Sequence, residues 1–96
     1  MEQLIYEKRK KLKQLIRKSI LENEKIYKLC RTEHEFNQYH RMEKLLNDSL
    51  VIAANLNNEI KIDIGINLYE QTFKDLKNII KKIRLGDKNW CGGKNE

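Results

Sequence analysis

The sequence predicts an all-α protein: a three-helix bundle, or a helical hairpin plus a third helix, in a single domain over residues 1–85. Two observations support this fold class. The 96-residue chain contains no proline and only four glycines, three of them in the last eleven residues, so residues 1–85 hold almost no helix breakers. Apolar residues also recur at helical spacing along most of the chain. Long helices are therefore expected.

The dominant element is an apolar stripe in the last third of the chain. Its members are spaced three and four residues apart and are Ile62, Ile66, Tyr69, Phe73, Leu76, Ile80 and Ile83. This spacing is typical of a helix that docks against other helices, as in a coiled coil. The stripe must be covered by the rest of the chain or by a second copy. We therefore expect these seven residues to form a core or an oligomerisation surface, and we expect a homo-oligomer such as a dimer.

Two earlier helices precede this element. The first is expected over residues 3–29, and its end is open between two pairs with the spacing of a capping box, Ser19 with Glu22 and Thr32 with Glu35. The second begins near Phe36 and fades into residues 55–58, three of which are asparagines. Asparagine favours local side-chain hydrogen bonds over helix, so this segment is the clearest turn in the chain.

Residues 60–68 fit two structures. Isoleucine or leucine alternates strictly with Lys61, Asp63, Gly65 and Asn67, which is typical of a half-buried strand. Because no second strand is evident, such a strand near 59–66 would have to pair between subunits. The same isoleucines also begin the helical stripe. The alternatives are therefore a helix from about residue 60, or an extended segment followed by a helix over 67–85.

The last eleven residues read as a helix stop at Gly86 followed by a flexible tail over 86–96. Trp90, the only tryptophan, either folds back onto the bundle or serves as a docking anchor, and we favour the fold-back. Cys30 and Cys91 are too few for a disulfide scaffold and are expected to be free thiols. The sequence shows no apolar run of about 20 residues and no signal-peptide core, so a cytoplasmic protein without a membrane span is expected.

Positive charge is concentrated at the two ends of the chain. The formal net charge is +6, and residues 1–20 contain seven basic and two acidic side chains. This charge favours an anionic partner, which could be nucleic acid, an acidic protein surface or anionic lipid, although solvated helix faces have a similar composition. The residues that we expect to bind such a partner are Lys10, Lys13, Arg17, Lys77, Lys81 and Arg84.

Motifs that would carry chemistry are scarce. His34 and Glu35 begin like a zinc-protease helix, but the second histidine should stand at position 38, which is Gln38. Cys30 and His34 would share one side of a helix, yet two ligands do not close a metal site. There is no glycine-rich phosphate loop and no serine in a nucleophile turn. We therefore expect no enzyme, no cofactor and no metal site.

One resemblance covers residues 5–40. It rests on the run Ile-Tyr-Glu-Lys-Arg-Lys-Lys-Leu at 5–12, followed by Leu21, Ile26, Leu29, Cys30, His34, Phe36 and Tyr39 or His40. This segment resembles the small aspartyl-phosphate phosphatases that act on sporulation response regulators. The resemblance implies a helical hairpin with a Gly-Leu turn and a Ser-x-x-x-Asp signature on the second helix. Here Ile20, Cys30 and His34 stand in place of the glycine, the serine and the aspartate, so what it implies is a helper that binds a response regulator.

Three functions from different classes follow. The first, which we favour, is a small non-catalytic regulatory or adaptor protein that acts through helix-mediated contact with a protein partner. The second is a basic helical protein that binds nucleic acid through the stretches Lys8–Lys18 and Lys74–Lys88, although few aromatic residues are present for base stacking. The third is a phosphatase-like regulator of a response regulator, centred on Cys30 and His34.

Overall fold

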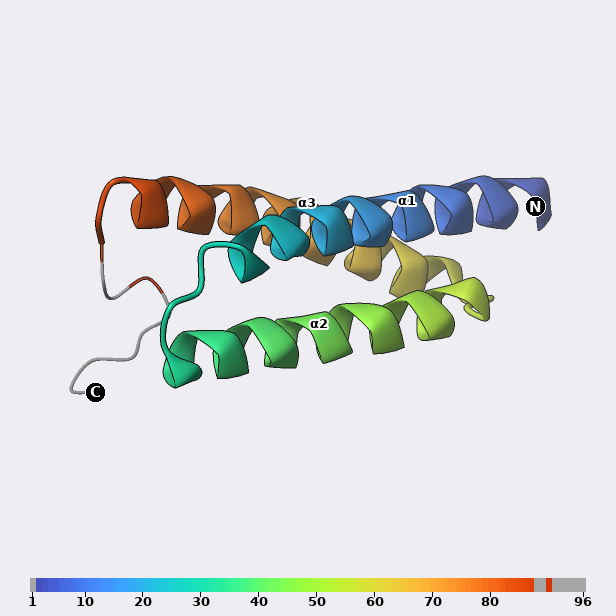
Figure 1. The fold of residues 1–96 in the computed structure, drawn as a ribbon. Helices are drawn as coiled ribbons and strands as arrows, with labels where there is room; N and C mark the ends of the chain where they lie inside the picture. The colour runs from blue at the N-terminus through green and yellow to red at the C-terminus, as the bar shows by residue number, and fades with distance from the viewer. Residues whose placement is uncertain (1, 88–89, 91–96) are drawn as a thin grey trace.

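The computed structural model describes residues 2–87 and 90, and this part of the chain contains three α-helices and no strand. The helices are α1 (Glu2–Tyr27), α2 (Glu33–Ala54) and α3 (Glu59–Arg84). Figure 1 shows that α1 and α3 run in the same direction, and that α2, which lies between them in the sequence, runs in the opposite direction. The Cα atoms extend over 50 × 20 × 20 Å, so the molecule is a short rod. The all-α, three-helix prediction is confirmed.

The boundary between α1 and α2 is the Thr32 capping box. The Glu35 amide donates to Thr32 Oγ1 over 3.1 Å, and the Thr32 amide donates to Glu35 Oε1 over 3.1 Å. These bonds satisfy donors that the helix start would leave without partners. The alternative break at Ser19 is wrong, because Ser19 lies fully buried inside α1 and donates to the Leu15 carbonyl over 3.0 Å.

The possible strand near 59–66 is also wrong, because α3 is helical from Glu59 onward. Asn58 caps the helix, accepting a hydrogen bond from the Lys61 amide over 3.0 Å. A helix satisfies its backbone groups within the segment, whereas a strand here would need a partner strand. It also buries Ile62 and Ile66, which are 0% and 8% exposed, while Ile60 and Ile64 face outward. The helix predicted from the three-four apolar spacing is therefore the observed structure, and the strand predicted from the alternation is not.

Most of the apolar stripe lies in the core of this single chain. Ile62, Ile66, Tyr69, Leu76 and Ile80 are buried, and Phe73 and Ile83 are half-buried. The buried residues that pack with them come from both other helices and are Leu12, Ile16, Ile26, Leu46 and Ala53. The rest of the chain covers the stripe, so a second copy is not required to do so. Self-association stays a prediction, and it would need another surface.

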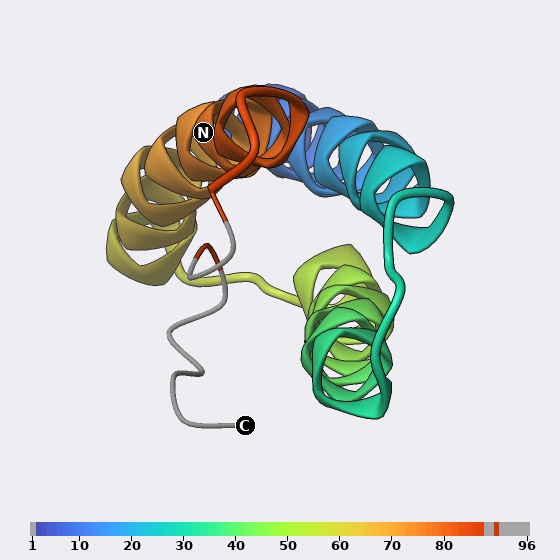
Figure 2. The same cartoon turned by 60° about the vertical axis from the view of Figure 1, so that its left-hand side comes forward.

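α1 is the central helix of the bundle. It packs against both other helices, whereas the backbones of α2 and α3 approach each other at only a few positions. Figure 2 shows α2 and α3 diverging on the side opposite α1. A hydrogen bond between the hydroxyl groups of Ser49 on α2 and Tyr69 on α3 joins these two helices at one point along their lengths.

Beyond α3, Gly86 adopts a φ of 89°, a left-handed conformation that favours glycine. Trp90 folds back and packs against the core, which is the alternative that we favoured for it. The other residues of the predicted tail, 88–89 and 91–96, lie outside the described residues. Among the described residues, no helix is long and apolar enough to cross a membrane.

Candidate docking groove and basic face

The first candidate site is the apolar surface along the edges of α2 and α3 that adjoin each other. On α2 this edge is the row Leu45, Ser49 and Ile52, whose three-four spacing places them on one side of the helix. Because Ser49 bonds to Tyr69 of α3, this row borders α3. Leu45 and Ile52 are nevertheless 53% and 61% exposed. This edge therefore carries apolar side chains that α3 does not cover.

The α3 edge of the groove contains Leu68 and Ile79. They are eleven residues apart, or about three helical turns, so they project from nearly the same side of the helix. Ile79 lines a pocket together with Tyr39 and Met42 of α2, so this side of α3 faces α2. Leu68 is 55% exposed. Leu45, Ile52 and Leu68 are thus exposed apolar side chains along these two edges, and we call the surface between the edges the α2–α3 groove.

Trp90 closes one end of the α2–α3 groove. There, side chains from all three helices and Trp90 enclose a pocket of about 200 Å³, lined by Asn23, Ile26, Gln38, Tyr39, Met42, Leu76 and Ile79. The indole Nε1 of Trp90 donates to Glu35 Oε2 over 3.1 Å. Trp90 is thereby attached to the start of α2.

Glu35 is the best-connected carboxylate in this region. Partial burial acts to raise its pKa, but hydrogen bonds from the Arg31 and Thr32 amides and from the Trp90 indole outweigh it and hold the pKa below the ordinary value. The carboxylate is therefore stabilised in its charged form. The two carboxylate oxygens have different partners. Oε1 accepts hydrogen bonds from both backbone amides, and Oε2 accepts one from the indole N–H.

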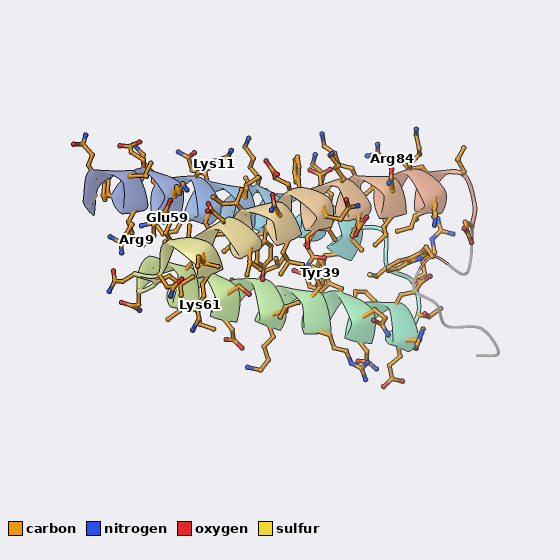
Figure 3. The ribbon with its side chains drawn as sticks, turned by 180° about the vertical axis from the view of Figure 1, so that it is seen from behind. Arg9, Lys11, Tyr39, Glu59, Lys61 and Arg84 are labelled. Atoms are coloured by element: carbon orange, nitrogen blue, oxygen red, sulfur yellow. The ribbon has the colours of Figure 1, made fainter. Side chains whose placement is uncertain are left out.

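Tyr39 lies beside this pocket and points from α2 toward the other helices (Figure 3). Its backbone carbonyl accepts a hydrogen bond from Asn23 Nδ2 over 3.4 Å, and its hydroxyl donates to Glu43 Oε2 over 3.3 Å. Burial, followed by the negative charge of Glu43, raises the pKa of the Tyr39 hydroxyl. Tyr39 is thus held neutral as part of the groove wall.

The charged rim of the groove is positive. Of the two acids on it, Asp48 forms an ion pair with Lys44 at 3.0 Å, whereas Asp75 accepts a hydrogen bond from the neutral Gln71 amide at 2.9 Å and keeps its negative charge. The cations on the same helix sides are Arg41, four residues before Leu45, and Lys61 and Lys82, at seven and fourteen residues from Leu68. None of these three cations has an ion-pair partner among the described residues.

The second candidate site is the basic outer face of α1 and α3. α1 contains eight basic and four acidic residues and α3 six and four, whereas α2 contains two and four. The positive charge thus resides on two neighbouring helices. Figure 3 shows Lys11 of α1 and Arg84 of α3 projecting from the edge of the molecule away from α2.

The six residues that we expected to bind an anionic partner fall into two groups, one on each of these two helices. All are exposed except Lys13, which is half-buried. The first group consists of Lys10, Lys13 and Arg17. It lies on the same side of α1 as Ile20 and Glu24, and these two residues line a pocket against α2. Lys77, Lys81 and Arg84 lie on α3. The structure therefore places the first group toward α2 and the second group on another helix.

Between these two groups lies a row of lysines. Its first two members belong to the stretch Lys8–Lys18 that the sequence offered for nucleic-acid binding, but sequence reasoning did not recognise the row. Lys11 is 3.9 Å from Glu70 of α3, so the side of α1 that carries Lys11 faces α3. Lys18 and Lys25 follow it at seven-residue intervals on the same side. The heptad spacing was visible in the sequence, but its position beside α3 depends on how the two helices pack.

The Cys30 and His34 pair does not lie on one helix as expected. Cys30 is in the loop before α2, where its thiol donates to the Ile26 carbonyl over 3.3 Å, while His34 belongs to α2. His34 Nε2 is buried and has no hydrogen-bond partner. Among the described residues, no group of three or more histidine, cysteine or acidic side chains is placed to hold a metal ion.

Comparisons with protein families, with curated proteins and with solved structures find no match for this chain. Any assignment of function therefore rests on its own residues.

Proposed function

We propose that this protein is a non-catalytic adaptor that binds an amphipathic helix of a partner protein in the α2–α3 groove. The observation that carries the proposal is the unequal packing of the three helices. In a four-helix bundle, each helix packs against two neighbours. Here α1 has two neighbours, while α2 and α3 barely approach each other. The open corner between α2 and α3 is where a fourth helix would complete the bundle.

The groove has the dimensions and chemistry for such a helix. α2 has 22 residues and is therefore about 33 Å long, which suits a partner helix of about 20 residues. Leu45, Ile52 and Leu68 supply half-exposed apolar contacts, the usual basis of helix-in-groove recognition. Their burial by a partner would contribute about 25 cal/mol per Å² of apolar surface.

The rim charges select the partner. Within the described part of the chain, Arg41, Lys61 and Lys82 have no ion-pair partner, Asp48 is paired with Lys44, and Asp75 keeps its charge, so three cations stand against one uncompensated anion. A helix with acidic residues beside its apolar stripe would match them, and a basic helix would be repelled. We therefore assign the groove to an acidic amphipathic helix.

The test uses a pair of synthetic amphipathic peptides of about 20 residues, one built of leucine and glutamate and the other of leucine and lysine. We expect the glutamate peptide to bind and the lysine peptide to bind at least about tenfold more weakly. Binding is measured by fluorescence anisotropy of the labelled peptide at several salt concentrations. Equal binding of both peptides, or of neither, would refute the proposal.

Two adjacent residues of α2 provide matched variants. Ile52 and Val51 are 61% and 65% exposed, but only Ile52 lies in the row that borders α3. Ile52→Glu should weaken binding of the glutamate peptide by about tenfold or more, because it places an anion in the apolar groove. Val51→Glu adds the same charge outside the groove and should leave the affinity nearly unchanged.

A second candidate function is nucleic-acid binding through the basic face. The observation that favours it is the lysine row Lys11, Lys18 and Lys25, which lies beside the basic half of α3. Contacts between lysines and phosphates would give binding that falls steeply with salt. A mobility-shift titration with random duplex DNA tests this, and no binding at about 50 mM salt would remove it.

The third expectation, a helper that binds a response regulator, stands as a narrower form of the adaptor proposal. Phosphate release from a phosphorylated response regulator, compared between the wild type and His34→Ala, tests whether His34 contributes chemistry.

A further inference from the structure

A small cavity lies between α1 and α2, away from α3. Its volume is about 60 Å³, and its lining residues are Ile20, Asn23, Glu24, Tyr39, Glu43, Leu46 and Asn47. Leu46 and Asn23 are 0% and 3% exposed and form its floor, whereas Glu24 and Asn47 are exposed and stand at its mouth. The cavity is therefore a notch that opens to solvent, and we call it the α1–α2 notch.

The α1–α2 notch contains two carboxylates, one from each helix. Glu43 of α2 accepts a hydrogen bond from the Tyr39 hydroxyl at 3.3 Å, and its other oxygen lies 3.1 Å from His40 Nδ1. The Glu24 carboxylate of α1 has no hydrogen-bond or ion-pair partner within the described part of the chain. Burial raises the pKa of the Tyr39 hydroxyl, and the negative charges of Glu43 and Glu24 raise it further. Both carboxylates therefore act on the same point of the notch.

A buried amide supplies a third oxygen acceptor. Asn23 Nδ2 donates to the Tyr39 backbone carbonyl over 3.4 Å, but Asn23 Oδ1 accepts no hydrogen bond from any residue that the structure describes. A buried polar oxygen without a donor is costly, which favours a ligand that carries one. The notch thus combines two negative charges with an unused acceptor at its floor.

We infer that the α1–α2 notch binds a guanidinium group, which belongs either to an arginine of a protein chain or to a small guanidinium compound. The two carboxylates favour a cation, and the Tyr39 ring adds an aromatic wall that suits one. The cavity volume is about twice the share of a water molecule in the liquid, which is enough for a cationic head group. No residue of α3 lines the notch, so the inference goes beyond helix docking and does not depend on it.

The arrangement of the acceptors favours guanidinium over other cations. Its planar group carries several N–H donors, so it can bond to oxygens of both helices at once, and it is less strongly hydrated than an ammonium. A metal ion is less well matched, since the described residues contain no group of three or more histidine, cysteine or acidic side chains placed to hold one.

The test is an NMR titration of isotope-labelled protein with Nα-acetyl-arginine amide, a capped arginine. The control probe is capped citrulline, which has nearly the same shape but no charge. We expect the capped arginine to shift the side-chain amide signals of Asn23 and Asn47 and to bind about tenfold more tightly than the citrulline probe. Equal binding of both probes, binding of neither, or shifts that leave Asn23 in place would overturn the inference.

Two variants locate the binding. Glu24→Gln removes one negative charge from the mouth of the notch at an exposed position, so the fold should be retained and the capped arginine should bind about fivefold more weakly. Asp75→Asn removes the same charge from α3 and should leave the affinity nearly unchanged. Equal weakening by both variants would show that the probe responds to net charge alone, and would overturn the site.

Two further probes identify the ligand. Capped lysine should bind about threefold more weakly than capped arginine, and equal binding would overturn the choice of guanidinium. Methylguanidinium separates the two sources of the group. Tighter binding of the capped arginine assigns the notch to an arginine of a protein chain, whereas equal binding of methylguanidinium assigns it to a small guanidinium compound.

Discussion

The packing of α1 against α3 can be tested at Gly65, where the Leu12 side chain of α1 lies against the backbone of α3. A Cβ atom added to Gly65 would lie 3.1 and 3.2 Å from the two Cδ atoms of Leu12, closer than ordinary van der Waals contact. Gly65→Ala gains about 1 kcal/mol of helix propensity. The forced movement of the buried Leu12 costs about 1–3 kcal/mol. We therefore expect Gly65→Ala to lower the free energy of unfolding by up to about 2 kcal/mol.

A second variant separates these two contributions. Leu12→Val removes both Cδ atoms and should itself cost about 1 kcal/mol. In that background Gly65→Ala should stabilise the protein by about 1 kcal/mol, because only the propensity gain remains. The two substitutions should therefore be coupled by about 1–3 kcal/mol. Urea unfolding followed by circular dichroism measures all four free energies. If Gly65→Ala stabilises the wild type by the full propensity gain, Leu12 does not contact α3 there and the described packing is incorrect.

Three further predictions concern the core, a helix cap and the basic face. Leu76→Asp should unfold the protein, since an unpaired charge at a position 2% exposed costs several kcal/mol, whereas Asn78→Asp on the exposed side should retain the helical circular dichroism signal. The lowered pKa of Glu35 means that its contribution to stability is full above the ordinary pKa of 4.5 and is lost as the pH falls through the folded-state pKa, so acid unfolding should be steeper in the wild type than in Glu35→Gln. Replacing Lys10 and Lys13 together with glutamate should change the free energy of unfolding by no more than about 1 kcal/mol while weakening any binding of duplex DNA.

The helices themselves could be predicted because their signals are local. The three-four spacing from Ile62 to Ile83 and the capping pair Thr32 and Glu35 each involve residues of one segment, and both features are present in the structure. The alternation of apolar and polar residues around Gly65 wrongly suggested a strand. A helix with apolar residues on two of its sides produces the same alternation. Ile60 and Ile64 occupy that second side and are 71% and 61% exposed.

The groove could not be predicted because it is a property of two helices at once. Ile52 and Leu68 are single apolar residues within otherwise ordinary helical patterns, and only the sparse packing of α2 against α3 leaves them 61% and 55% exposed on adjoining edges. The contact between Glu35 and Trp90 likewise joins residues 55 positions apart. For the same reason, the sequence could point to the basic residues, but their division into separate rows depends on how α1 packs against its neighbours.

The central claim is that the α2–α3 groove is the surface this protein uses to hold a partner helix. Methyl resonances report this directly when isotope-labelled protein is titrated with the leucine and glutamate peptide. We predict that the methyl signals of Leu45, Ile52 and Leu68 shift together while those of Val51 and Ile60 stay in place. Shifts centred on Val51 or Ile60, or shifts of equal size over the whole molecule, would contradict the claim.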